Sequence, residues 1–256
     1  MWLARAITPL LDLIYPWTCP VCRSAFEATE ESPGPLCRTC LGALERIENE
    51  PHCLRCTHPL PMHGSPCPAC FGKGPPNYFR VVRLGAYAPP LQDLIIQLKY
   101  HKRWGLGEEL ADRLLASEAA KEVLHETEVL IAVPLHWKRR LTRWYNQAEV
   151  VARRLSKKCG IKLAHPVRRT RNTETQTHLH SRAKRERNLR GAFELIDAKA
   201  IAGKHVTVVD DVWTTGSTLQ ALARALKPAG PKSLSALVLA AADPRGYERV
   251  EKREEG

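Results

Sequence analysis

The stretch VTVVDDVWTTGST, residues 206–218, decides the fold and also points to the site. It begins as an apolar, β-branched run over residues 206–209 and continues in two adjacent carboxylates, Asp210 and Asp211. It then turns through small hydroxyl residues and Gly216 into the start of a helix. A buried strand of this kind belongs to a parallel sheet, and open parallel sheets bind ligands at the carboxyl ends of their strands. We therefore expect the strand to end at the two acids and the acids to face a ligand crevice.

The polar groups of this stretch suit a sugar phosphate. The two carboxylates can accept hydrogen bonds from vicinal sugar hydroxyls, and the start of the helix offers N–H groups and hydroxyls to a phosphate dianion. Gly216 lets the backbone approach a ligand closely. The residues that we expect at the phosphate are Thr214, Thr215, Gly216, Ser217 and Thr218. The stretch is not a Walker loop, because no Lys follows its Gly.

Strands and helices alternate on either side of this stretch. The strands that we expect are residues 80–88, 129–133, 206–209 and 234–240. We expect five helices. The first is opened by Pro89 and Pro90, the second runs through Leu106 and Leu114, the third extends from Asn146 to Gly160, the fourth lies within residues 181–189, and the fifth runs through Leu219 and Leu226. Alternation of this kind predicts a parallel sheet that is covered on both faces.

Eight of the nine cysteines form four CxxC pairs before residue 71. Four-thiolate zinc sites need paired ligands on tight turns, and we see no secretory signal that would favour disulfides. A redox dithiol is disfavoured, because all four pairs lie in a Pro-rich, helix-poor stretch. The expected zinc ligands are Cys19, Cys22, Cys37, Cys40, Cys53, Cys56, Cys67 and Cys70.

Eight thiolates suit two structural zinc ions, and the sequence leaves open whether the pairs combine consecutively or interleave. We interpret His52, His58 and His63 as solvated loop residues rather than ligands. Cys159, near an expected helix end, is interpreted as a small packing residue. Removal of the metal should loosen residues 19–70 and leave the sheet folded.

Charge is concentrated in one segment of the 256-residue chain. The formal net charge is +12, and residues 138–190 hold seventeen basic and three acidic residues. The positive field of this segment attracts either a nucleic-acid backbone or a small polyphosphate, and the sign of the charge alone does not distinguish the two ligands. No apolar run of about 18 residues occurs, so we expect no membrane span.

Composition divides the chain into three parts. Residues 1–78 would hold an amphipathic N-terminal helix and the zinc ribbons, because a Gly- and Pro-rich linker ends near Tyr78. Residues 79–242 would form the sheet domain, and residues 243–256 a charged tail. We interpret residues 1–17 as a helix rather than a signal peptide, since Asp12 interrupts their apolar run.

Residues 206–218 resemble the signature by which type I phosphoribosyltransferases bind phosphoribosyl pyrophosphate. The whole chain resembles the ComF family of competence-type proteins, which join a double zinc ribbon to a phosphoribosyltransferase domain. Besides the cysteine pairs, the resemblance rests on LKYHK (98–102), VPLHWKRR (133–140), YNQAE (145–149) and RERNLRGAF (185–193). It implies an α/β fold with a parallel sheet of the type I phosphoribosyltransferase kind and an N-terminal double zinc-ribbon module. Trp144 departs from the family pattern, which has Gly there.

The resemblance also implies roles for individual residues. Residues 135–143 would contact the pyrophosphate, and residues 168–187 would close over the site. The implied catalytic residues are Asp210, Asp211 and Arg143, and the implied ligand contacts beyond the 206–218 stretch are Leu135, His136 and Arg139. Lys99 and Tyr100 belong to a matching motif without an assigned role.

Three functions of different classes follow. The first is transfer of ribosyl 5-phosphate from phosphoribosyl pyrophosphate, with Mg²⁺, to an acceptor that the sequence does not identify. The alternative is a non-catalytic accessory that handles single-stranded DNA together with DNA-uptake proteins. The third function is that of a ligand-sensing regulator with the same fold, although the sequence shows no evident helix-turn-helix segment. Each of them would act in the cytoplasm.

Overall fold

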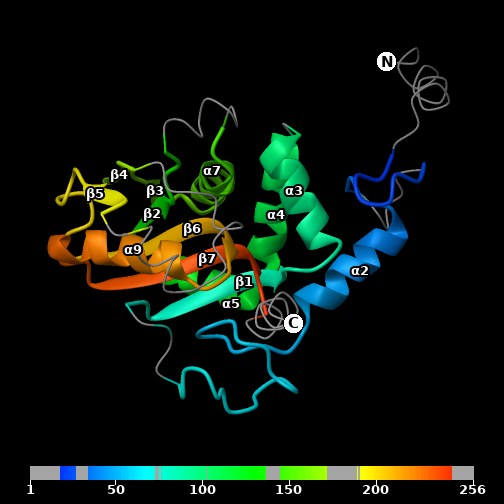
Figure 1. Cartoon of the computed structure of the whole chain (residues 1–256), viewed down its shortest axis with the longest axis horizontal. Helices are drawn as coiled ribbons and strands as arrows, with labels where there is room; N and C mark the ends of the chain where they lie inside the picture. The colour runs from blue at the N-terminus through cyan, green and yellow to red at the C-terminus, as the bar shows by residue number, and fades with distance from the viewer. Residues whose placement is uncertain are drawn as a thin grey trace, which may run out of the picture.

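A five-stranded parallel sheet forms the centre of the molecule. The computed structural model of the chain describes residues 18–26, 34–72, 75, 77–101, 103–136, 145–171, 189 and 191–243. In spatial order the strands are β1 (Arg80–Ala86), β7 (Ser233–Ala241), β6 (His205–Trp213), β2 (Val129–Ala132) and β3 (Lys162–Leu163), and every neighbouring pair is parallel. The predicted α/β fold is therefore confirmed (Figure 1).

Apolar layers cover both faces of the sheet. Because successive strand residues point to opposite faces, Leu130 joins one apolar cluster and Ile131 the other. The first face packs against α3 (Leu91–Tyr100), α4 (Trp104–Ala116), α5 (Glu118–Glu126) and α7 (Gln147–Cys159). The second face packs against α9 (Ser217–Leu226) and an antiparallel ribbon of β4 (Val167–Arg169) and β5 (Phe193–Leu195).

The ends of two helices follow the expected capping chemistry. The side-chain oxygen of Asn146 accepts a hydrogen bond from the Ala148 N–H, and its amide donates to the Val133 carbonyl, so α7 begins beside the end of β2. The same helix ends at Gly160, whose φ is 70°. After α9 the chain continues through a short 3₁₀ turn, η2 (Lys227–Ala229), to Gly230 with φ 64°.

The sequence expectations differ from the structure in the ends of two strands and in several elements, including β3, that were not expected. Strand β6 does not end at Val209 but continues to Trp213, because its pairing with β7 extends as far as Trp213 opposite Ala241. Strand β1 ends at Ala86 rather than at residue 88. Helix α5 and the β4–β5 ribbon were not expected. The helix expected within residues 181–189, the N-terminal helix and the charged tail lie outside the described residues, apart from a few positions.

The cysteine-rich region contains a helix, contrary to the helix-poor expectation. Helix α2 (Arg38–Glu48) begins directly after Cys37 and buries Leu44 and Ile47. This apolar side continues into the cluster formed by α3 and α4, so the first cysteine group shares a core with the sheet. The guanidinium of Arg113 on α4 also donates two hydrogen bonds of 2.7 Å to the Glu48 carboxylate.

Within the part of the chain that the structure describes, the helices are all too short or too polar to cross a membrane.

Candidate functional site

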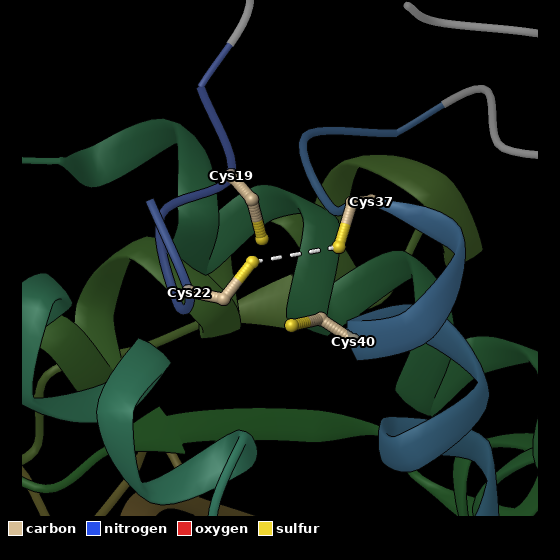
Figure 2. Close-up of side chains that lie close together, drawn as sticks. All are labelled: Cys19, Cys22, Cys37 and Cys40. Carbon is tan, nitrogen blue, oxygen red and sulfur yellow. Dashed lines mark hydrogen bonds between the residues drawn. The ribbon is translucent and has the colours of Figure 1, made fainter. Parts of the chain in front are cut away.

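The first cysteine group has the geometry of a four-thiolate metal site. Figure 2 shows Cys19, Cys22, Cys37 and Cys40 turned toward a common centre. All four sulfur atoms lie within 4.8 Å of one another, and the Sγ atoms of Cys22 and Cys37 are 3.6 Å apart. A tetrahedral zinc ion with bonds of about 2.3 Å holds its sulfur ligands roughly 3.8 Å apart. The group therefore fits zinc and is far too open for a disulfide of about 2 Å.

The second group repeats this geometry with the remaining four cysteines of the CxxC pairs. Its Sγ–Sγ distances are 3.7 Å between Cys53 and Cys70 and 3.6 Å between Cys56 and Cys67. Together the two groups settle the pairing that the sequence left open: the CxxC pairs combine consecutively rather than interleaved.

Tight turns shape three of the four CxxC pairs. The residue after the second cysteine has a positive φ in each of them: 62° at Arg23, 64° at Thr57 and 47° at Phe71. The N–H of that residue donates back to the carbonyl of the first cysteine, as from Arg23 to Cys19 at 2.9 Å. The Cys37–Cys40 pair instead lies on the first turn of α2.

Other candidate metal ligands lie elsewhere. A ring nitrogen of His52 lies 2.8 Å from the Glu50 carbonyl, and one of His63 lies 3.1 Å from the Asn49 carbonyl. These histidines are not part of either thiolate group.

Cys159 is exposed, so its interpretation as a packing residue is wrong. It is the last residue of α7, beyond the turns whose apolar face packs on the sheet.

The two acids of β6 occupy an edge of the sheet where one neighbouring strand stops. Pairing between β6 and β2 ends with Val209 opposite Ala132, whereas β7 continues beside β6. Asp210 and Asp211 therefore lie at the point where the sheet opens on the β2 side. The N–H of Asp211 donates to the Asp210 carboxylate at 2.9 Å. This is the crevice position in which open α/β sheets bind ligands.

The turn that follows the acids leads into the N-terminus of α9. Gly216 precedes the helix with φ 73°, and a Cβ atom at this position would lie 2.6 Å from the Trp213 ring. The hydroxyls of Thr215 and Ser217 lie 2.7 Å apart. A small recess at this turn is lined by Asp210, Val212, Trp213, Thr214, Gly216, Ser217, Thr218 and Leu219. The structure thus brings together the acids and the hydroxyl residues that the sequence analysis selected.

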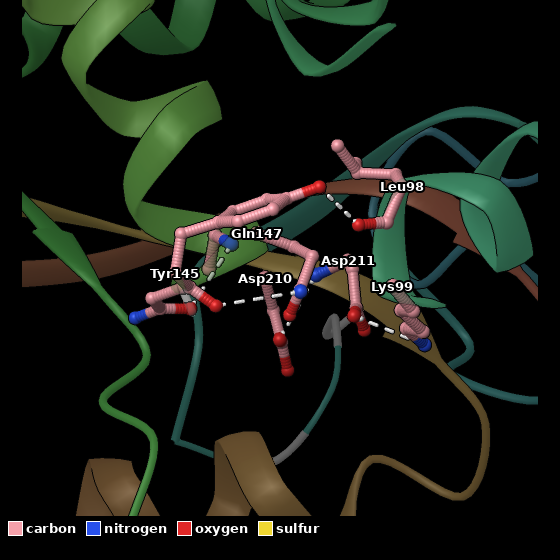
Figure 3. A network of polar contacts seen from close by, with 8 residues as sticks. Leu98, Lys99, Tyr145, Gln147, Asp210 and Asp211 are labelled. Carbon is pink, nitrogen blue, oxygen red and sulfur yellow. Dashed lines mark hydrogen bonds and ion pairs between the residues drawn. The ribbon is translucent and has the colours of Figure 1, made fainter. Parts of the chain in front are cut away.

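A lysine from a distant part of the chain reaches this site. The ammonium group of Lys99, on the last turn of α3, lies 3.0 Å from a carboxylate oxygen of Asp211 (Figure 3). Sequence reasoning assigned Lys99 no role, and the signal that could have found it is its place in the LKYHK motif.

The charges at the site are strongly coupled. Burial of the carboxyl group and the negative charge of Asp211 raise the pKa of Asp210 to about 7. Burial opposes the charge of Lys99, but the two carboxylates outweigh burial, so the pKa of Lys99 is raised. The site therefore places a carboxyl group with a raised pKa, Asp210, close to the ammonium group of Lys99.

Leu135 and His136 follow β2, at the same edge of the sheet as the two acids. His136 is buried, with 4% of its surface exposed, and Leu135 is partly buried. Arg139, Arg140 and Arg143 lie outside the described residues.

The start of the segment expected to close over the site belongs to the β4–β5 ribbon. The guanidinium of Arg168 donates two hydrogen bonds, of 2.9 and 3.1 Å, to the Glu194 carboxylate. That of Arg169 lies over the Phe193 ring, 5.5 Å from its centre. Residues 172–187 lie outside the described residues.

Comparison with known proteins identifies the family. Residues 10–71 match the double zinc ribbon domain family, and residues 146–254 match the phosphoribosyl transferase domain family. The chain is 34% identical to competence protein F of Haemophilus influenzae over 208 residues, which cover 79% of this chain and 90% of that protein. The chain belongs to the ComF family. Its two cysteine groups are accordingly the two four-cysteine sites of a double zinc ribbon.

Relatives of the ComF-family chain also include proteins named for DNA utilization. It is 37% identical to DNA utilization protein YhgH of Escherichia coli K12 over 183 residues, which cover 68% of this chain and 77% of that protein. The corresponding Salmonella typhimurium protein is 34% identical over 221 residues, 84% of this chain and 92% of that one.

Solved phosphoribosyltransferases are more distant. The purine phosphoribosyltransferase of Pyrococcus horikoshii aligns with a TM-score of 0.34 and 22% identity, over 52% of this chain and 72% of that one. Glutamine phosphoribosylpyrophosphate amidotransferase of Bacillus subtilis aligns with a TM-score of 0.38 and 18% identity, over 56% of this chain and 30% of that one. The family assignment does not depend on either structure.

Proposed function

We propose that this ComF-family protein binds phosphoribosyl pyrophosphate with Mg²⁺ at the turn between β6 and α9, and transfers the ribosyl 5-phosphate to an acceptor. The observation that carries the proposal is the juxtaposition of Asp210 and Asp211 with the N-terminus of α9. One short segment then offers carboxylates to a ribose diol and N–H groups to the 5-phosphate.

Each part of the site has a chemical role in this proposal. The hydroxyls and N–H groups at 214–218 bind the 5-phosphate, and Asp210 and Asp211 accept hydrogen bonds from the ribose hydroxyls. Transfer breaks the bond from the ribose carbon to pyrophosphate, whose oxygen keeps the electron pair, and the nucleophile then bonds to that carbon. The two carboxylates face the positive charge that develops on the ring.

The pyrophosphate side of the ligand is assigned to the segment after β2. We propose Leu135, His136, Arg139 and Arg143 as its contacts, because β2 ends beside the two acids of β6. Mg²⁺ would enter with the ligand and supply positive charge to the leaving pyrophosphate. Mg²⁺ prefers oxygen ligands, and the phosphates of the ligand would themselves supply them.

The zinc sites take no part in the proposed chemistry. Four thiolates complete the tetrahedral shell of zinc and leave no open position for a reacting water, so both sites are structural. Reduced, paired thiolates of this kind suit the cytoplasm, where we place the protein.

A calorimetric titration tests this function. Phosphoribosyl pyrophosphate should bind more tightly than either ribose 5-phosphate or pyrophosphate alone, and Mg²⁺ should strengthen its binding. Release of pyrophosphate in a screen of nitrogen nucleophiles would then establish transfer. Equal affinity for the whole ligand and for free pyrophosphate would contradict a site for the ribosyl phosphate.

A second candidate function, binding of single-stranded DNA, is favoured by an exposed aromatic pair. Tyr100 ends α3 and Trp104 begins α4, and each is 60% exposed. In the sequence they flank the basic stretch His101, Lys102 and Arg103. Aromatic rings that stack on bases, next to cations that contact phosphates, are the usual means of binding single strands. The DNA-related names of the relatives agree with this candidate without testing it.

Salt dependence separates the two candidates. If single-stranded DNA binds through phosphates, affinity should fall with salt with a slope of about −0.7 per phosphate neutralised. Replacing Tyr100 and Trp104 with Ala should weaken that binding by about 1–3 kcal/mol per stacked base. If Arg168, Arg169 and Arg171 instead belong to a segment that covers pyrophosphate, their replacement by Ala should weaken the binding of phosphoribosyl pyrophosphate far more than the binding of ribose 5-phosphate.

A further inference from the structure

The pair formed by Lys99 and Asp211 links α3 to the centre of the candidate site. Both side chains are mostly enclosed, with 18% of each exposed, and their charged atoms are 3.0 Å apart. An enclosed pair is screened by solvent far less than a surface pair. The ammonium group is therefore a fixed part of the site's electrostatics.

Two neighbouring contacts hold the end of α3 in place. The Tyr145 hydroxyl, just before α7, donates to the Leu98 carbonyl (Figure 3). The Gln97 side-chain amide donates to the Pro20 carbonyl, inside the first zinc-binding turn. Three consecutive residues of one helical turn thus contact a zinc site, the start of α7 and the carboxylate of Asp211. The position of Lys99 is fixed by these contacts and does not depend on a ligand.

The groups that act on the two acids come from several elements. Within the described residues, Lys99 on α3 and Arg169 on β4 act on Asp210, and Tyr87 after β1 acts on Lys99. Tyr78 before β1 also faces the acids, since burial and the charge of Asp210 raise its pKa. Lys99 has a larger effect on Asp210 than Arg169 has, and its ammonium group also forms an ion pair with Asp211.

We propose that Lys99 is a positioning residue of the candidate ribose-phosphate site: its ammonium group holds the Asp211 carboxylate in the crevice and offsets the negative charge of the Asp210–Asp211 pair. The proposal rests on the function proposed above for this site. It assigns Lys99 no contact with the ligand.

The chemistry of a ribose diol explains why such a cation is needed. Ribose hydroxyls donate most strongly to ionised carboxylates, whereas a protonated carboxyl group is itself a donor. Two adjacent, enclosed carboxylates favour retention of a proton, because both burial and mutual repulsion disfavour the second negative charge. A nearby ammonium group reduces that repulsion, so both acids can act as acceptors when the ligand enters.

Three variants test the proposal. Lys99→Gln removes the charge, Lys99→Arg keeps it, and Lys121→Gln removes an exposed lysine on α5 that pairs with Glu118 outside the site. We expect Lys99→Gln to weaken the binding of phosphoribosyl pyrophosphate at least about tenfold at pH 7, by analogy with the loss of one charge-assisted hydrogen bond. Lys99→Arg should retain most of the affinity, and Lys121→Gln all of it.

The pH profile distinguishes positioning from packing. The loss of affinity caused by Lys99→Gln should shrink between pH 7 and pH 9, because higher pH ionises Asp210 without help from a cation. A loss that is equal across this range, or equally large for Lys99→Arg, would overturn the proposal, since it would indicate a role in packing alone.

A measurement on the ligand-free protein separates this proposal from the proposed function. Carbon-detected NMR of the carboxyl groups should show that Lys99→Gln raises the apparent pKa of Asp210 relative to wild type and to Lys121→Gln. An unchanged titration would contradict the role of Lys99. Absence of phosphoribosyl pyrophosphate binding by the wild-type protein, together with a shifted titration, would instead contradict only the function.

Discussion

At Asp210 the requirements of binding and of folding oppose each other. A carboxyl group whose pKa is raised to about 7 on folding, from about 3.9 in an unfolded chain, stabilises the fold in its protonated form. That contribution is complete below pH 4 and is lost as the pH rises toward 7 and above. At neutral pH ionisation of Asp210 therefore lowers the stability of the protein, and a ligand that donates hydrogen bonds to the carboxylate would recover it.

Asp210→Asn makes this conflict measurable. The variant keeps an oxygen to accept from the Asp211 N–H and cannot ionise. We expect it to be more stable than wild type at pH 8, by about 1 kcal/mol or more, since each pKa unit corresponds to about 1.4 kcal/mol. The difference should vanish toward pH 4. Urea unfolding at both pH values is the measurement, with the exposed Asp197→Asn as control, and a difference that does not change with pH would refute it.

Gly216 is required by its surroundings for two independent reasons. Its φ of 73° disfavours any other residue, and a Cβ atom would clash with the Trp213 ring at 2.6 Å. Gly230 has a similar φ of 64°, but a Cβ atom there would meet nothing within 4 Å. Gly216→Ala should therefore cost about 1–3 kcal/mol of unfolding free energy, and more than Gly230→Ala, which adds backbone strain alone. Equal losses in urea unfolding would show that the ring yields.

At the scale of single residues, the sequence predicted those site residues that lie close together in the chain. Asp210, Asp211 and Gly216 stand in one segment, and their spacing carries the prediction. Lys99 belongs to a helix far away in the chain, and only the packing of α3 against the sheet brings it to Asp211. No local pattern encodes such a contact, which is why the sequence analysis gave Lys99 no role.

At the scale of elements, helices were predicted correctly where their apolar residues recur at helical spacing over a long stretch. Helices α3, α4, α7 and α9 formed as expected, because each has a buried apolar stripe at helical spacing. Helix α2 was missed, because its residues lie among cysteines that suggested only turns. Strand β6 was predicted too short, since pairing with β7 carries it past two charged residues that would otherwise end an apolar run.

Helix α3 should depend on one zinc site and not on the other. Cys19, Cys37 and Cys40 share an apolar cluster with α3, and the four cysteines of the second site do not. We expect replacement of Cys37 and Cys40 with Ser to speed amide hydrogen exchange in α3, whereas replacement of Cys67 and Cys70 with Ser should leave α3 unchanged. This revises the expectation that metal removal spares the whole sheet domain. Equal exchange of α3 in both variants would contradict the dependence.

The molecule as a whole joins a metal-stabilised region to a sheet through one continuous core. Because eight thiolates form two complete groups, protein purified under reducing conditions should contain about two zinc ions per chain. Metal analysis by mass spectrometry checks this number. One ion or none would contradict the assignment of both groups.

The fold class and the parallel direction of the strands could be predicted from the sequence, because strands that alternate with helices favour a parallel sheet. The consecutive pairing of the CxxC motifs could not, because both pairings satisfy the same spacing and only the fold brings particular sulfur atoms within reach. The shared core of α2, α3 and α4 was also beyond the sequence, since a linker near Tyr78 suggested two separate units.

The most direct test of the proposed site is the affinity of phosphoribosyl pyrophosphate for the protein in which Asp210 and Asp211 are both replaced with Asn. Asn keeps the size of Asp and removes the charge that strengthens hydrogen bonds from ribose hydroxyls, at about 1.5–3 kcal/mol for each bond. We predict that calorimetry will show at least a roughly tenfold loss of affinity, with Asp197→Asn equal to wild type. Unchanged affinity in a folded double variant would contradict the account, because the ligand would then bind elsewhere.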